Sequence, residues 1–140
     1  MGQGVQIVHP VNLYGCKLDA NVSVGPFVEI QKDVTIGARS KIQSHTFICS
    51  LVDIGEDCFI GHGVMFVNDK LVGGPAQGDK SRWKRTSVGN RVSIGSNATI
   101  LPVAICDDVV IGAGSVVTKD IEVSGTYAGN PARKIIGMQD

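Results

Sequence analysis

The chain has 140 residues, which suits one domain but leaves no room for separate catalytic and substrate modules, so a complex site has to be shared between subunits. Lysine plus arginine and aspartate plus glutamate both number 13, and the resulting net charge of zero excludes an overall attraction to nucleic acid or to an anionic membrane. No segment approaches the roughly 20 apolar residues of a membrane span, and no basic stretch precedes an apolar run at the N-terminus. We therefore expect a cytoplasmic protein.

An aliphatic residue, often followed by glycine, returns every six positions along most of the chain. The members of this series are Ile7, Leu13, Leu18, Val24, Ile30, Ile36, Ile42, Ile48, Ile54, Ile60, Phe66, Val88, Ile94, Ile100, Ile105, Ile111, Val117 and Val123. Two positions earlier stands a small or β-branched residue: Val22, Val28, Val34, Ser40, Thr46, Val52, Cys58, Val64, Thr86, Val92, Ala98, Val103, Val109 and Ser115. Both series are predicted to point inward.

A period of six residues does not match a helix that turns every 3.6 residues, and it is too long for simple strand alternation. It requires a short strand followed by a corner, and three such units make a triangular coil of roughly 18 residues. Stacked coils pair each strand in parallel with its equivalents above and below. We therefore predict an all-β, left-handed parallel β-helix of about six coils in one domain over residues 1–140. A sandwich would need hairpin turns that the sequence lacks.

Counting the repeats from Ile7 assigns each strand to one of three faces. The first face carries Ile7, Val24, Ile42, Ile60, Ile94 and Ile111, the second carries Leu13, Ile30, Ile48, Phe66, Ile100 and Val117, and the third carries the rest. Glycine often follows the aliphatic residue, where a side chain would crowd the corner or φ would be positive. We expect a short tail over residues 124–140.

The repeat stops after Phe66 and restarts at Thr86, which predicts a loop over residues 67–85 that is ejected from one corner. Long excursions from a rigid scaffold often carry function, although such a loop can also serve only as a subunit contact. Near its end, four cations surround Trp83: Lys80, Arg82, Lys84 and Arg85. Phosphates and a base of a nucleotide would suit this mixture, and a solvated charge run with a packed Trp83 is the alternative.

Several segments together resemble the hexapeptide-repeat acyltransferases. They are the stacked Ile-Gly repeats, Phe66-Val67-Asn68-Asp69 at the loop start, residues 93–102, residues 110–120 and Ala128-Gly129-Asn130-Pro131-Ala132-Arg133. The Phe-x-Asn-Asp loop is similar to that of N-acetyltransferases acting on nucleotide-linked 3-amino sugars. This resemblance implies acetyl-CoA as co-substrate, a homotrimer and coenzyme sites in clefts between neighbouring prisms.

The resemblance also implies which residues follow the coenzyme path: Ala113, Gly114, Thr118, Lys119 and Arg133, with Ser96 beside them. Backbone groups at glycine-rich corners can bond to pantetheine amides, and Lys119 and Arg133 can meet phosphates. The alternative is that Ala113-Gly114 is another tight corner. One residue is missing between Pro102 and Val103, where relatives usually carry a glycine, so the path of that corner differs from the family pattern.

The residues at the loop start indicate which acceptor would react. A sugar hydroxyl is a very weak acid and needs a general base, for which related O-acetyltransferases carry a histidine in the loop. Residues 67–85 contain no histidine, and Asn68-Asp69 stands in its place. An amine can attack a thioester directly, so Asn68 is predicted to orient it through its side-chain carbonyl and Asp69 to position its cationic form. Backbone N–H groups at a corner are expected to hold the oxyanion.

Two histidines are further candidates. His45 and His62 follow Ile42 and Ile60, so they should lie near one another on one edge of the prism, next to Ser96 and Ala113. That edge does not bear the loop. In a trimer a neighbour's loop could reach it, which would make either histidine a base or an amine ligand, whereas a structural corner role is the alternative. Carbonic anhydrases of this fold bind zinc through three histidines, but their His-x4-His spacing is absent, so no metal is expected.

Three functions stay open at this point. The first is N-acetylation of a nucleotide-linked amino sugar, the second is O-acetylation of a sugar, which would need His45 or His62, and the third is a non-catalytic binding or assembly module. Many relatives carry an additional N-terminal domain, so the chain could also be part of a longer enzyme.

Overall fold

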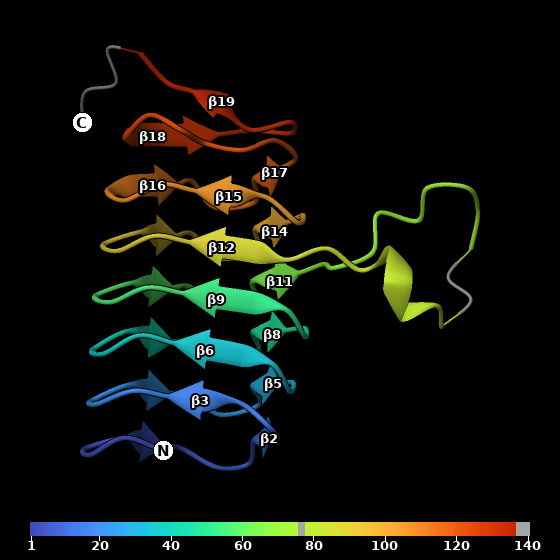
Figure 1. Ribbon diagram of the computed structural model, residues 1–140. Coiled ribbons are helices and arrows are strands. Elements are labelled where there is room, and N and C mark those ends of the chain that lie inside the picture. Colours follow the sequence, from blue (N-terminus) through green and yellow to red (C-terminus); the bar gives the residue numbers. More distant parts are fainter. Residues whose placement is uncertain (76–77, 137–140) are drawn as a thin grey trace.

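The computed structural model describes residues 1–75 and 78–136, and these form a parallel β-helix in which short strands wind around a common core (Figure 1). Sheet A holds β1 (Gln6–Ile7), β4 (Ser23–Val24), β7 (Lys41–Ile42), β10 (Phe59–Ile60), β13 (Ser93–Ile94), β16 (Val109–Ile111), β18 (Gly125–Ala128) and β19 (Arg133–Lys134). Sheet B holds β2 (Asn12–Leu13), β5 (Glu29–Ile30), β8 (Phe47–Ile48), β11 (Met65–Phe66), β14 (Thr99–Ile100) and β17 (Val116–Val117). Sheet C holds β3 (Lys17–Leu18), β6 (Val34–Ile36), β9 (Val52–Ile54), β12 (Thr86–Val88) and β15 (Ala104–Ile105).

The three sheets are the three faces predicted from the repeat. On the first face Ile42 pairs with Val24 and with Ile60, one coil away on either side. On the second face Phe66 pairs with Ile100. Every strand pairing is parallel except that of β18 with β19, among the residues that the structure describes. The prediction of a parallel β-helix is thus confirmed, and its left-handed sense stays a prediction.

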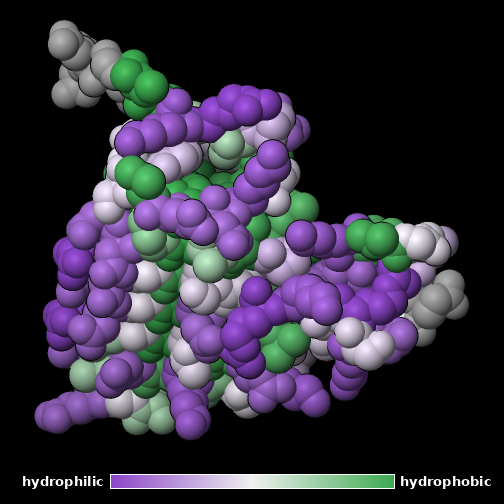
Figure 2. Space-filling view, turned by 45° about the horizontal axis from the view of Figure 1, so that its top comes forward, coloured by the Kyte–Doolittle hydropathy of each residue, from purple (hydrophilic) through white to green (hydrophobic). Residues whose placement is uncertain are grey.

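The core lies inside the coil, and the inward series accounts for most of it. Every one of the small or β-branched residues predicted to point inward is buried. Four of them carry hydroxyl groups, and each hydroxyl donates a hydrogen bond to a backbone carbonyl: Ser40 to Gly55, Thr46 to Gly61, Thr86 to Leu101 and Ser115 to Gly112. These bonds satisfy the buried polar groups, which is why the repeat tolerates serine and threonine there. On the face in view, Figure 2 shows a largely hydrophilic outer surface with a narrow strip of apolar side chains between hydrophilic ones.

The C-terminal end of the repeat differs from the prediction in two ways. Val123 is 57% exposed, so its inward assignment is wrong; Ile121 instead bridges to Ile105 and is buried. The last corner is two residues shorter than the pattern, which shifts the inward position. In addition, part of the predicted tail is regular structure, because β18 extends sheet A and begins a seventh turn.

The corner glycines are required by crowding rather than by φ. A Cβ added to Gly37 would lie 2.5 Å from the carbonyl carbon of Gly55, on the next coil. Positive φ falls two positions later in the corner, at residues such as Arg39 (φ 62°) and His45 (φ 66°). The first corner residue therefore sets how closely two coils can stack. No helix among the described residues is long and apolar enough to cross a membrane.

Candidate functional site

The loop over residues 67–85 leaves the prism at edge B–C, the row of corners that connects sheet B to sheet C (Figure 1). Its two ends are held together, because the N–H of Lys84 donates to the carbonyl of Asn68 at 2.8 Å. Arg85 is bound to the outer face of sheet C, where its Nη1 lies 2.8 Å from Oδ2 of Asp53. The hydroxyl of Thr35 donates to the other oxygen of Asp53 at 2.7 Å. These bonds anchor the base of the loop to the rigid coil.

Asn68 has a defined side-chain orientation. Its Nδ2 donates to the carbonyl of Ser50 at 3.1 Å, one coil below. Within the described residues, no protein group donates to its Oδ1. The side chain is half-buried and lines a cavity of about 300 Å³. The other lining residues are Gln31, Phe47, Cys49, Phe66, Val67, Asp69 and Trp83. Asn68 thus offers a hydrogen-bond acceptor to this cavity, on a wall that also includes Trp83.

Asp69 is already engaged by the loop itself. Its Oδ1 accepts from the N–H of Leu71 at 2.8 Å and lies 3.6 Å from Nη2 of Arg82. Its side chain is 13% exposed. The carboxylate therefore faces a permanent cation, and a substrate ammonium would have to share it with Arg82.

The loop residues predicted to meet a nucleotide do not form a single cluster within the chain. Arg82 donates to the carbonyls of Val72 and Gly74, at 2.7 and 3.4 Å, and so holds the loop's own turn in place. Lys80 begins a short 3-10 helix (Lys80–Arg82), and its Nζ lies 5.8 Å from the ring centroid of Trp83, which follows that helix. With Arg85 bound on sheet C, only Trp83 among them lines the Asn68 cavity.

His45 and His62 lie on edge A–B, the row of corners between sheets A and B, and not on the loop edge. The ring of His45 stacks on Phe27 with a centroid distance of 5.0 Å. The N–H of His62 donates to Oγ of Ser96 at 3.3 Å. The carbonyl of Ser96 in turn accepts from Gly114, at 2.8 Å. This places Ser96 and Gly114 one and two coils above His62, as the register predicts.

The remaining coenzyme candidates are spread over the prism. Ala113 is exposed on edge A–B, whereas Thr118 and Lys119 follow β17 at edge B–C. Arg133 is exposed on β19, where it pairs with Ala128. Gly114 has φ of 70°, and no atom lies within 4 Å of where its Cβ would be, so the backbone conformation rather than space favours glycine. A single prism does not bring these residues to one site.

Gln31, Phe47 and Cys49 line the Asn68 cavity and were not singled out from the sequence. Gln31 and Cys49 both occupy the first corner position of edge B–C, one after Ile30 and the other after Ile48. Burial raises the pKa of the Cys49 thiol to about 11, so this thiol is neutral at physiological pH and is no nucleophile. The sequence signal that could have identified Gln31 and Cys49 is the lack of glycine directly after the aliphatic residues of the second face.

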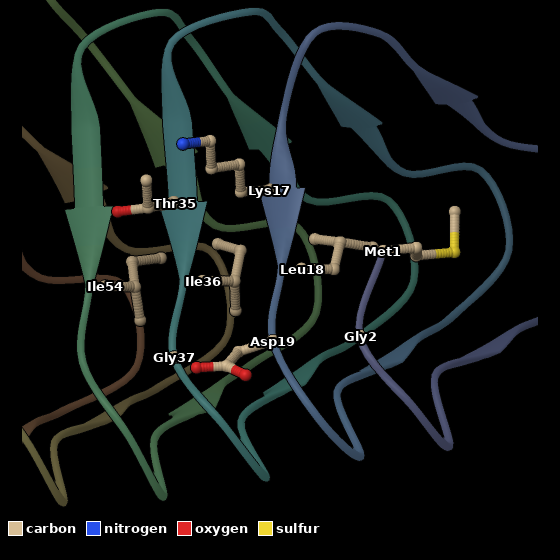
Figure 3. A pocket seen from close by; sticks show the side chains of 9 residues that line it. All are labelled: Met1, Gly2, Lys17, Leu18, Asp19, Thr35, Ile36, Gly37 and Ile54. Atoms are coloured by element: carbon tan, nitrogen blue, oxygen red, sulfur yellow. The ribbon is translucent and has the colours of Figure 1, made fainter.

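Other surfaces of the prism lie apart from these residues. A depression of about 600 Å³ runs along β3, β6 and β9 near the N-terminus and is lined by Lys17, Asp19 and Thr35 among others (Figure 3). It contains none of the predicted site residues. No group of three or more histidine, cysteine, aspartate or glutamate side chains in residues 1–75 and 78–136 could hold a metal ion.

Comparison with protein families adds to this geometry. A family described as "Hexapeptide repeat of succinyl-transferase" matches residues 85–119, and one described as "Bacterial transferase hexapeptide (six repeats)" matches residues 15–50. The chain belongs to the hexapeptide-repeat transferases. The two matched stretches lie on either side of the loop, so the loop is an insertion into a hexapeptide-repeat scaffold.

Individual proteins are also similar to this chain. The bifunctional protein GlmU of Streptococcus uberis is 36% identical over 123 residues, which cover 87% of this chain and 24% of that protein. A histidine-to-asparagine mutant of perosamine N-acetyltransferase from Caulobacter crescentus, solved in complex with CoA and GDP-perosamine, is 26% identical with a TM-score of 0.78. The match covers 94% of this chain and 57% of that one.

A third similar protein is AntD, an N-acyltransferase from Bacillus cereus. A serine-to-threonine mutant of AntD, solved in complex with dTDP and coenzyme A, matches with a TM-score of 0.82 at 24% identity. The match covers 96% of this chain and 80% of that one, and it shows the fold alone. The match to GlmU covers 24% of that protein, so this chain spans about a quarter of the length of this curated relative.

Proposed function

We propose that the protein transfers an acetyl group from acetyl-CoA to the amino group of a nucleotide-linked amino sugar, of the 3-amino-3-deoxy type. The observation that carries this proposal is Asn68, whose Nδ2 is bound to Ser50 so that its carbonyl is available to an acceptor in the cavity. The likeness to perosamine N-acetyltransferase, solved with GDP-perosamine, supports a nucleotide-linked sugar as the acceptor.

The chemistry requires no protein base at Asn68. Acetyl-CoA supplies an activated thioester carbonyl. The amine nitrogen forms a bond to that carbonyl carbon as the carbon–sulfur bond breaks, and the proton that the nitrogen loses can pass to the departing thiolate, whose pKa as a free thiol is about 8.5. Asp69 would bind the acceptor in its cationic form, which releases one proton to solvent before attack. Asn68 would then hold one N–H of the neutral amine that attacks the thioester.

The proposed coenzyme path uses Ser96, Ala113 and Gly114 on edge A–B, and Thr118, Lys119 and Arg133 near edge B–C and the C-terminal end. The exposed cations and the open glycine corner fit a coenzyme with phosphates and amides. Because the two groups lie on different edges of one prism, a cleft between two prisms would bring them together. We therefore propose a homotrimer with sites between subunits, in which a neighbour's loop meets His45 and His62.

The test is an assay of coenzyme A release from acetyl-CoA with a panel of nucleotide-linked 3-amino and 4-amino sugars. Turnover with an amino sugar and none with its hydroxyl counterpart is expected. Turnover of hydroxyl acceptors alone would overturn the proposal. Light scattering of the same sample should give three times the 14.7 kDa chain mass.

O-acetylation is the second candidate, favoured by the two histidines on one edge. It requires His45 or His62 as base, because a hydroxyl needs one. A double variant, His45→Gln with His62→Gln, that keeps full turnover excludes it. A protein that binds no acetyl-CoA by calorimetry would instead be a non-catalytic member of the fold.

A further inference from the structure

The orientation of Asn68 depends on a chain of polar groups that begins on lower coils. The N–H of Ser50 donates to Oε1 of Gln31 at 3.1 Å, and the carbonyl of Ser50 accepts from Asn68. Leu51, which shares a peptide group with that carbonyl, donates its N–H to the backbone carbonyl of Asp33 at 3.2 Å. The backbone around buried Ser50 is thus held on both sides, so its carbonyl keeps a constant direction toward Asn68.

Glu29 decides which end of the Gln31 amide faces Ser50. Nε2 of Gln31 donates to Oε2 of Glu29 at 3.1 Å, and Nδ2 of Asn12 donates to Oε1 of Glu29 at 3.3 Å. An ionised carboxylate only accepts hydrogen bonds, so the NH₂ group of Gln31 has to point to Glu29. Its oxygen is then left for Ser50. The amide orientation of Gln31 is therefore fixed by a carboxylate that cannot donate.

We propose that Gln31, held by Glu29, is a positioning residue: it fixes the Ser50 peptide, whose carbonyl binds the Asn68 amide group, so that Asn68 presents its own carbonyl to the acceptor. This inference rests on the proposed function. This orientation of Asn68 gives a reason for selectivity toward an amine. A hydroxyl has a single proton, and it would donate that proton in a hydrogen bond to the Asn68 carbonyl, which is not a base. An amine bonded to Asn68 still has a further proton to lose.

Gln31→Met removes the amide from a side chain of similar length, and Asn90→Leu is the matched control. Oδ1 of Asn90 also accepts from a backbone N–H of an adjacent coil, that of Glu56 at 2.9 Å, but at edge C–A, the row of corners between sheets C and A. We expect the two variants to lose similar thermal stability. Only Gln31→Met should lower kcat with amino sugars, by about tenfold, with little change in KM for acetyl-CoA.

Gln31→Glu provides a pH readout that a purely structural role would not give. Glu29 on β5 bonds to Gln31, and Cys49 after β8 and Asp69 in the loop line the cavity with it. Lys32 and Asp33 flank position 31 in the chain, and Arg82 lies 3.6 Å from Asp69, but no cation lines the cavity among the described residues. A carboxyl group introduced there would be protonated more readily than usual, and once protonated it can accept from Ser50 and donate to Glu29. The kcat of Gln31→Glu relative to the original protein should therefore rise as the pH falls.

Hydrogen exchange of the Asn68 side-chain amide, followed by NMR, separates this inference from the proposed function. In the original protein and in Asn90→Leu this NH₂ group should be protected, and in Gln31→Met it should exchange faster. If no amino sugar is turned over, the proposed function fails, while the exchange rates still test the positioning. Equal kcat and equal exchange in Gln31→Met and Asn90→Leu would overturn the role of Gln31.

Discussion

Edge B–C and edge C–A are built from the same repeat, yet they use the first corner position differently. On edge C–A this position is glycine in three coils, Gly37, Gly55 and Gly89, and an added Cβ would meet backbone of the next coil. On edge B–C no corner has glycine there: the residues are Tyr14, Gln31, Cys49, Val67, Leu101 and Thr118. The side chains of three of them line the Asn68 cavity. The edge without glycine at this position is the one that carries the Asn68 cavity.

The polar groups of edge B–C and edge C–A also differ in how they are arranged. At edge C–A, exposed pairs repeat from coil to coil, with Arg39 bound to Asp57 at 2.8 Å and Arg91 to Asp108 at 2.7 Å. At edge B–C, a single chain of half-buried groups ends at Asn68. Regular exposed pairs lock neighbouring coils in register, whereas a directional, partly buried chain fixes one group. Four predictions separate these roles.

The largest effect is expected for Asn68→Ala. Loss of the carbonyl that would hold the amine should lower kcat by about 100-fold, because the acceptor is no longer oriented for attack. Coenzyme A release under saturating acetyl-CoA measures this. Asn97→Gly, at an exposed corner of edge A–B where φ is 61° and glycine is tolerated, should fold and serves to check that losing an asparagine is not harmful in itself. An Asn68→Ala protein with more than half the original kcat would remove Asn68 from the mechanism.

Next in size is the stability difference between corners. Gly37→Ala forces a Cβ against the backbone of Gly55, so we expect a loss of about 1–3 kcal/mol in the free energy of unfolding. Cys49→Ala, at the same position of edge B–C, removes only one sulfur atom and should cost about 1 kcal/mol. Urea unfolding of both variants tests this. The reverse order would show that the first corner position does not control coil stacking.

The third prediction concerns the thiol at the cavity. Burial raises the pKa of Cys49 to about 11, so little thiolate exists near neutral pH and alkylation by iodoacetamide should be slow. Mass spectrometry of peptides from the folded protein should show Cys106 labelled before Cys49. Rapid labelling of Cys49 would mean that the cavity opens widely to solvent.

The smallest effect is expected for the exposed pairs of edge C–A. The hydrogen bond from Arg39 lowers the pKa of Asp57, so the stabilisation is present above the ordinary aspartate pKa of about 3.8 and is lost as the pH falls through the lower, folded value. Asp57→Asn should therefore be slightly less stable than the original protein at neutral pH and equally stable in strong acid, below both pKa values. Thermal unfolding under both conditions measures the difference. A gap that persists in acid would point to a cause other than the ion pair.

Much of the fold could be read from the sequence because one inward residue every six positions fixes both strand and face. Ile42, Ile60 and Ile94 were assigned to one face, and they pair there. The inward assignment of Val123 was wrong, because it continued the six-residue step across a last corner that is two residues shorter. The sequence pattern also could not explain the corner glycines, because the explanation depends on the distance between stacked coils.

The site could be predicted less completely. The register correctly separated the edge of His62 from the edge of the loop. The partners of loop cations could not be foreseen, because Arg82 and Arg85 are close in sequence but donate to different parts of the structure, one to the loop and one to Asp53. The link from Gln31 to Asn68 depends on side-chain conformations across stacked coils, and hydropathy carries no information about them.

The hydrogen bond between Lys84 and Asn68 has a consequence for how this protein could change over evolution. Because it closes the loop at its base, the two ends of the segment between these residues leave the scaffold side by side. Doubling the length of such a closed segment costs only about 0.6 kcal/mol in chain entropy. New acceptor preferences could therefore arise by exchange of this segment alone, with no change to the coils that would hold the coenzyme.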